Sequence, residues 1–142
     1  MIHWTSHSVA ETEKIAEGFA ASLSAGDVIA CRGGMGMGKT AFARGLARGL
    51  GLRDDVSSPT FALVHEYTDG RIPLYHFDMY RINSFEGLYS TGFFDYLEQG
   101  GVLLIEWSEN IEGALPEGTI TLEICRGADE NTREIRIEGG RF

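Results

Sequence analysis

The segment Gly33–Thr40 constrains the fold of this chain more than any other feature. It reads Gly-Gly-Met-Gly-Met-Gly-Lys-Thr and fits the pattern G-x-x-x-x-G-K-T without a mismatch. A short apolar run, Val28–Cys31, precedes it, and a helical pattern from Lys39 to Leu50 follows. A continuous apolar run of this kind is typical of a strand buried on both faces of a sheet. The sequence therefore predicts a strand, a glycine-rich turn and a helix, which is the central unit of an α/β fold.

The residue types in this segment suit a phosphate ligand. Glycines let the backbone turn its N–H groups toward phosphate oxygens, and a helix that begins at Lys39 adds the positive end of its dipole. The Lys39 ammonium is expected to reach the β- and γ-phosphates, and the Thr40 hydroxyl is expected to ligate Mg²⁺. We therefore predict that ATP and Mg²⁺ bind here, through Gly33, Gly34, Met35, Gly36, Met37, Gly38, Lys39, Thr40 and Ala41.

The rest of the chain predicts a mixed sheet with helices on its faces. Ser8 and Glu11 form a capping box, so a helix is expected over Val9–Leu23. Strands are expected over 61–67 and 72–80, over 102–105 and on both sides of the polar turn 127–131, with short helices over 84–97. Because no linker or repeat interrupts the chain, residues 1–142 are predicted to form one domain. Its expected fold is a three-layer, P-loop NTPase-like α/β fold, in which helices flank a mixed sheet with antiparallel hairpins.

A loop of this kind needs an acid near the metal, usually at the end of a neighbouring strand. Glu106 closes the apolar run 102–105 and is the first candidate, with a solvated strand-end carboxylate as the alternative. Asp78 is the second, with a salt bridge to Arg81 as its alternative. Thr60 follows Ser-Pro and is either a sensor of the γ-phosphate or part of an ordinary turn. The predicted catalytic residues are Glu106, Asp78, Lys39 and Thr60, and the predicted metal ligands are Thr40 and Glu106.

The charge of the chain argues against direct binding to nucleic acid. The formal net charge is −9 and only two lysines are present, whereas phosphate neutralisation supplies most of the affinity for DNA or RNA. We therefore expect no DNA binding, and any tRNA is expected to be held by a partner protein. No apolar run is long enough to span a bilayer and the N-terminus does not resemble a signal peptide, so a cytoplasmic protein without membrane contact is expected.

Absent motifs narrow the enzyme class. The chain has no Asn-Lys-x-Asp and no Asp-x-x-Gly after a strand, which argues against a GTPase. A small-metabolite kinase on the same fold stays open, although the arginines are scattered rather than gathered in a lid. His65 and His76 show no metal-ligand spacing, and we interpret both as structural or interface residues.

In sequence the chain resembles the TsaE (YjeE) family of bacterial ATPases, which serve threonylcarbamoyladenosine formation on tRNA. The resemblance runs in order through most of the chain. It comprises Gly33–Thr40, Val56–Val64 with its Ser-Pro-Thr, Tyr75–Arg81 with its Asp-x-Tyr-Arg, and Leu104–Trp107 with its Ile-Glu-Trp. The departures from the family pattern are Gly34, Met35, Met37, Ala41 and Ser108, and none removes a phosphate- or metal-binding group.

The resemblance implies an accessory ATPase that hydrolyses ATP slowly alone and faster with the proteins TsaB and TsaD. In that family TsaD transfers threonylcarbamoyl to the adenosine beside the anticodon, so tRNA would be met only through the complex. The resemblance also implies that the adenine base lies between the start of the first helix, near Ser8 and Val9, and the last hairpin, where Arg133 matches a family arginine.

Overall fold

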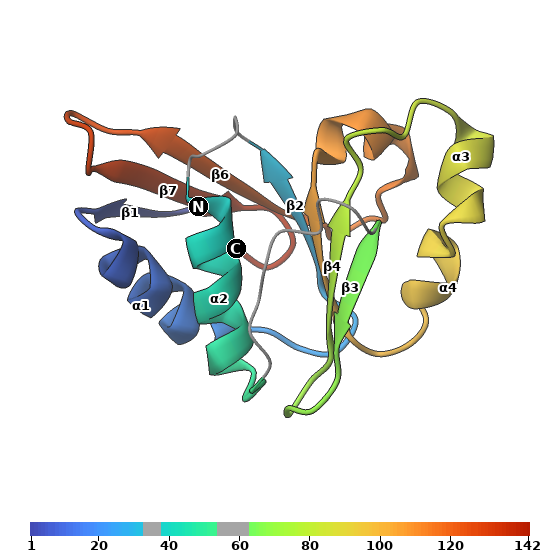
Figure 1. Cartoon of the computed structure of the whole chain (residues 1–142), viewed down its shortest axis with the longest axis horizontal. Coiled ribbons are helices and arrows are strands. Elements are labelled where there is room, and N and C mark those ends of the chain that lie inside the picture. Colours follow the sequence, from blue (N-terminus) through green and yellow to red (C-terminus); the bar gives the residue numbers. More distant parts are fainter. Residues whose placement is uncertain (33–37, 54–62) are drawn as a thin grey trace.

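A seven-stranded mixed sheet forms the centre of the computed structural model, which describes residues 1–32, 38–53 and 63–142 (Figure 1). The strand order is β1-β7-β6-β2-β5-β4-β3. β2 is parallel to both β5 and β6, and β4 is parallel to β5, whereas the pairs β3–β4, β6–β7 and β1–β7 are antiparallel. The strands are β1 Ile2–Ser6, β2 Val28–Arg32, β3 Val64–Tyr67, β4 Leu74–Asp78, β5 Val102–Glu106, β6 Ile120–Arg126 and β7 Arg133–Glu138.

Helices cover both faces of this sheet. α1 (Val9–Ala20) and α2 (Lys39–Gly49) lie side by side on one face, and α3 (Phe85–Ser90), α4 (Phe93–Tyr96) and the 3₁₀ helix η1 (Ser108–Ala114) lie on the other (Figure 1). Two apolar cores result. Phe42 and Leu46 of α2 pack on the first face, and Phe93 of α4 packs against Phe77 of β4 on the second. The predicted three-layer α/β fold with a mixed sheet is confirmed.

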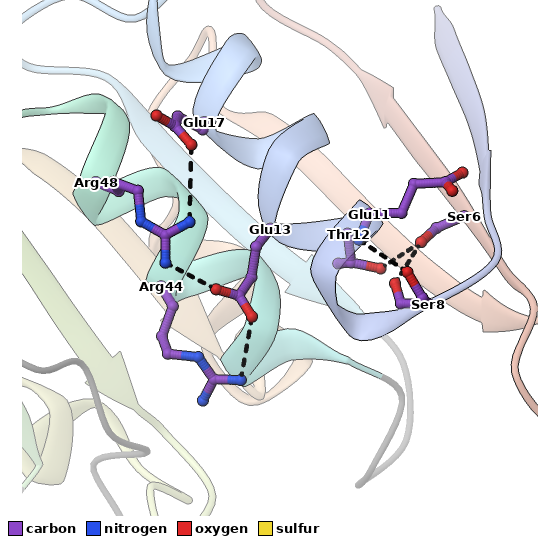
Figure 2. A network of polar contacts seen from close by, with 8 residues as sticks. All are labelled: Ser6, Ser8, Glu11, Thr12, Glu13, Glu17, Arg44 and Arg48. Carbon is purple, nitrogen blue, oxygen red and sulfur yellow. Dashed lines mark hydrogen bonds and ion pairs between the residues drawn. The ribbon is translucent and has the colours of Figure 1, made fainter.

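The contact between α1 and α2 is close enough to require glycine. A Cβ atom added at Gly45 would lie 2.1 Å from the Glu13 carbonyl oxygen, so no side chain fits there. Around this contact, Arg48 pairs with Glu13 at 2.9 Å and with Glu17 at 3.7 Å, and Arg44 also pairs with Glu13 at 3.7 Å (Figure 2). These two arginines of α2 therefore join it to α1.

Most predicted elements are present with shifted ends. The Ser8 side chain accepts a hydrogen bond from the Glu11 N–H at 3.0 Å, which confirms the predicted start of α1, although α1 ends three residues before Leu23 (Figure 2). Both predicted hairpins form, but the start of the first, at residues 61 and 62, lies outside the described residues. The break near Gly92 is confirmed, because Gly92 adopts a φ of +80° between α3 and α4.

β1 is not among the strands predicted from the sequence. Residues 2–6 pair with β7 along their whole length, so a segment at the start of the chain becomes an edge of the sheet. Trp4 packs against the core below α1. Across residues 1–32, 38–53 and 63–142, no helix is long and apolar enough to cross a membrane.

Candidate phosphate-binding and acid site

The chemistry-bearing residues gather at the carboxyl ends of the parallel strands. Lys39 begins α2, which follows β2 and residues 33–38. Glu106 is the last residue of β5, and Asp78 is the last residue of β4. The parallel register places Asp78 directly opposite Glu106. This edge of an open α/β sheet is where ligands bind in such folds.

Glu106 is the centre of the described site. Its side chain is almost buried, and its Oε2 lies 2.7 Å from Nε2 of His76, while its Oε1 lies 3.9 Å from Nζ of Lys39. Burial raises the pKa of the Glu106 carboxyl, but the hydrogen bond and charge of His76 and the ammonium of Lys39 outweigh burial and hold that pKa below its ordinary value. Glu106 is only 8% exposed, so the alternative of a solvated strand-end carboxylate is wrong.

Lys39 is equally well enclosed. It is 7% exposed, and its Nζ lies 5.7 Å from the centroid of the Trp107 ring, a distance typical of a cation–π contact. Trp107 follows Glu106 and adopts a left-handed backbone conformation with φ of +58°, which is uncommon for a residue with a side chain. This turn directs the chain away from β5 immediately after the acid.

Hydrogen bonds tie the three strand ends together beneath this turn. The Ser108 hydroxyl donates to the Cys31 carbonyl at 3.0 Å, which joins η1 to β2. The Met79 N–H donates to the Glu106 carbonyl at 3.0 Å, and the Asn110 amide donates to the Met79 carbonyl at 2.8 Å. The position of Glu106 is thus fixed from β2, β4 and η1. The sequence analysis did not predict the roles of Ser108 and Asn110, because a lone serine or asparagine after a strand carries no specific signal.

Asp78 lies on the same face of the sheet but makes different contacts. Its Oδ1 accepts a hydrogen bond from the Tyr80 N–H at 2.9 Å, and the side chain is half-buried. Within the described part of the chain, no ion pair joins Asp78 to Arg81, so the alternative of a hairpin salt bridge is not what the structure has. For the second carboxylate oxygen of Asp78, Oδ2, the structure gives no hydrogen bond or ion pair with another described residue.

Several predicted residues fall at or beyond the limits of what is described. Gly33, Gly34, Met35, Gly36 and Met37 lie outside the described residues, as does Thr60, so their predicted roles stay predictions. The end of the glycine-rich segment is described. Gly38 has a φ of +98°, which suits glycine, Thr40 is half-buried at the start of α2, and Ala41 is buried.

The residues predicted to lie near the base come together at another corner. Ser8 caps α1, and Val9 is 60% exposed. Arg133 begins β7 directly opposite Ser6, two residues before Ser8, so the sheet register brings these segments to one corner. The Arg133 guanidinium donates to the carbonyls of Glu130 and Thr132. The predicted base contact itself stays a prediction.

The chain as a whole matches known proteins. The family model described as "Threonylcarbamoyl adenosine biosynthesis protein TsaE" matches residues 6–135. A tRNA threonylcarbamoyladenosine biosynthesis protein TsaE of Bacillus subtilis is 40% identical over 143 aligned positions, covering 99% of this chain and 89% of that protein. The one of Treponema pallidum is 42% identical, covering 81% of this chain and 84% of that protein. This chain belongs to the TsaE family.

A solved structure agrees with that assignment. The crystal structure of Bacillus subtilis YdiB superposes with a TM-score of 0.84 at 37% identity, covering 98% of this chain and 85% of that chain. The predicted resemblance to TsaE is therefore confirmed, and with it a role for this TsaE-family chain in tRNA threonylcarbamoyladenosine biosynthesis.

The oxygen donors at the ends of β4 and β5 and at the start of α2 suit magnesium. Hydroxyl and carboxylate oxygens from Thr40, Glu106 and Asp78 are the hard ligands that Mg²⁺ prefers, and proteins usually hold it with one or two such groups, phosphates and water. Among the described residues, no cluster of three or more His, Cys, Asp or Glu side chains forms a cage for a metal. The donor set therefore fits an ion that arrives with a phosphate ligand.

His76 was predicted to be a structural or interface residue, and its burial agrees with a structural role. Its imidazole is fully buried and hydrogen-bonds Glu106, a contact that was not predicted. A signal was available. His76 and Asp78 are two residues apart on one strand and so share a face of the sheet, and that face carries the other acid of the site. His65, opposite His76 on β3, contacts Tyr67 instead, at 3.3 Å.

Proposed function

We propose that this chain is an accessory ATPase of tRNA threonylcarbamoyladenosine biosynthesis, which binds Mg-ATP on Gly33–Thr40 and hydrolyses it in support of the TsaB–TsaD complex. One observation carries the proposal: Lys39, the lysine of the P-loop sequence, and Glu106, at the carboxyl end of β5, are both buried, and Nζ of the first lies 3.9 Å from Oε1 of the second. The Lys39 ammonium is one of the groups that lower the pKa of the Glu106 carboxyl, so Glu106 is held ionised beside it while the anionic ligand is absent.

The side chains supply distinct parts of the reaction. Lys39 and the N-terminus of α2 bind the phosphates, and the Thr40 hydroxyl and the acids hold the cation. When bound, Mg²⁺ neutralises charge that develops on the phosphate oxygens during transfer. Glu106, ionised because its pKa is lowered, accepts a hydrogen bond from the attacking water and orients it. Thr60 keeps its predicted role as sensor of the γ-phosphate.

The charge of the chain and an exposed aromatic residue near the site support a protein partner rather than direct contact with RNA. The net charge of −9 disfavours binding to the phosphate backbone of RNA. Tyr80, which follows Asp78 by two residues, is 59% exposed and packs its ring 5.0 Å from that of Trp107. The segments 57–60 and 78–81 are therefore the proposed switches, which meet TsaB–TsaD when the γ-phosphate and Mg²⁺ are bound.

The deciding experiment measures ATP hydrolysis by the chain alone, with TsaB–TsaD, and with TsaB–TsaD and tRNA. We expect slow turnover alone and faster turnover with the partners. Phosphate transferred to a small alcohol instead of water would contradict the proposal and favour a small-metabolite kinase.

A second experiment tests whether docking to TsaB–TsaD depends on the bound nucleotide and whether the chain alone binds tRNA. Docking to TsaB–TsaD is measured with an ATP analogue, with ADP and without nucleotide, beside a filter-binding titration of tRNA on the isolated chain. We expect the ATP analogue to favour docking and the isolated chain to bind tRNA weakly. Docking that ignores the nucleotide, or micromolar tRNA binding at physiological salt, would overturn the proposed partner arrangement.

A further inference from the structure

His76 is fully buried in the middle of β4, and its imidazole is hydrogen-bonded to the carboxylate of Glu106. Its Nε2 lies 2.7 Å from Oε2 of Glu106. A carboxylate only accepts, so Nε2 carries the proton of this bond. Nδ1 is buried and has no hydrogen-bond partner within the described part of the chain. Among the described residues, Glu106 is thus the one hydrogen-bond partner of the ring, through Nε2.

The two oxygens of Glu106 have partners of different kinds. Oε2 is bonded to His76, whose strand is hydrogen-bonded to β5 along its length. Oε1 faces the Lys39 ammonium at 3.9 Å, which is an ion pair without a direct hydrogen bond. Lys39 belongs to the phosphate-binding motif, so in the proposed function it turns toward phosphate when ATP binds. The bond to His76 is then the contact within this group that keeps the carboxylate in place.

We propose that His76 is a positioning residue for ATP hydrolysis: by holding Oε2 of Glu106 it leaves Oε1 directed at the site once Lys39 has engaged phosphate. This inference rests on the proposed function and adds to it a residue that touches neither nucleotide nor water. Without this bond the Glu106 side chain could adopt several rotamers, and the bond from His76 selects one of them. This matters because a catalytic carboxylate must be held within a fraction of an ångström of its working position.

Two substitutions that differ by one methylene test this role. The side-chain nitrogen of His76→Gln reaches the position of Nε2 and can still donate to Glu106, whereas that of His76→Asn falls short. We expect ATP turnover with TsaB–TsaD to fall by about tenfold in His76→Asn and to stay within about threefold of wild type in His76→Gln. Affinity for an ATP analogue should change little in either. His65→Asn, one strand away in register with His76, is the matched control and should leave turnover unchanged.

A double-mutant cycle separates positioning from general damage to the fold. If His76 acts through Glu106, His76→Asn should lower turnover by less than about twofold in a Glu106→Gln background. A full tenfold loss in that background would overturn the proposal, as would wild-type turnover in His76→Asn itself. A wild-type chain that hydrolyses no ATP would instead overturn the proposed function.

A spectroscopic readout is independent of turnover and of variants at position 76. In the ¹⁵N-labelled wild-type chain without nucleotide, the Nε2–H resonance of His76 should be protected from exchange with water. It should move when Glu106→Gln replaces the charged acceptor, and it should not move in His65→Asn. A resonance that Glu106→Gln leaves in place would overturn the contact on which the proposal depends.

Discussion

An acid with a lowered pKa lies at each end of the central strands, Asp27 at the amino end and Glu106 at the carboxyl end. The two acids differ in the groups that they contact. At the amino end, Asp27 lies just before β2, and Arg141 donates to both of its oxygens at 3.1 and 2.7 Å, while the Ser24 N–H donates at 2.7 Å. At the carboxyl end, Glu106 has one firm hydrogen bond, from His76, and a looser ion pair with Lys39.

Burial acts in the same direction at both ends. It raises the pKa of Asp27 and of Glu106, and in each case hydrogen bonds and cations outweigh it. The donors to Asp27 are a backbone amide and the arginine near the end of the chain, all of them parts of the fold. One partner of Glu106 is the lysine of a phosphate-binding motif. A lowered pKa alone therefore does not mark a functional acid, and it is the shared partner Lys39 that supports the proposed role of Glu106.

The largest expected effect is on nucleotide binding at the carboxyl end. Lys39→Ala removes charge-assisted contacts to the β- and γ-phosphates, each worth about 1.5–3 kcal/mol. We therefore expect affinity for an ATP analogue to fall by at least about tenfold in calorimetry at moderate salt. Asp27→Asn should leave that affinity unchanged. Tight binding by Lys39→Ala would contradict the assignment of the P-loop.

The next effect separates binding from chemistry. Glu106→Gln keeps the shape of the side chain but removes its charge, so nucleotide should still bind while Mg²⁺-dependent turnover falls by about tenfold or more. Phosphate release and calorimetry on the same preparation distinguish the two quantities. Unchanged turnover would remove Glu106 from the reaction and make Asp78 the leading acid.

At the amino end the expected effect is on stability. Asp27→Asn weakens the pairing with Arg141 and should lower the free energy of unfolding by about 1–2 kcal/mol, a modest amount because the Arg141 side chain is 47% exposed. Urea denaturation measures this change. ATP turnover should stay at the wild-type rate, and a loss of turnover without a loss of stability would break the distinction between the two ends.

The smallest effect is the pH dependence of that stability difference. The pKa of Asp27 is lower in the folded chain than its ordinary value of 3.8, so its contribution is fully present above pH 3.8 and is lost as the pH falls through the folded value. Wild type and Asp27→Asn should therefore differ most near neutral pH and converge in acid. Denaturation curves at a series of pH values check the sign, and a difference that grows toward acid pH would contradict it.

The sequence by itself determined the local elements of this protein. Residues 28–32 and 102–106 are strands because continuous apolar runs suit a sheet buried on both faces, and Glu106 is placed at a strand end by the same pattern. Ser8 caps the start of α1 and Gly92 separates α3 from α4, since capping and a positive φ depend on one residue and its immediate neighbours. The predicted phosphate-binding motif, Gly33–Thr40, is likewise a local pattern in the sequence.

Only the tertiary structure decided which of these elements meet. Residues 2–6 pair with β7, which lies near the other end of the chain. Arg141 donates hydrogen bonds to Asp27, and His76 is hydrogen-bonded to Glu106. Likewise, the sequence alone shows Gly45 only as a residue of low helix propensity. The structure shows that the Glu13 carbonyl lies too close for any side chain at this position. The physical reason is that periodicity reports which face of an element is buried but not which other element buries it. That choice depends on packing and hydrogen bonds between residues distant in sequence, and here it made His76, expected to be a structural or interface residue, the hydrogen-bond partner of Glu106.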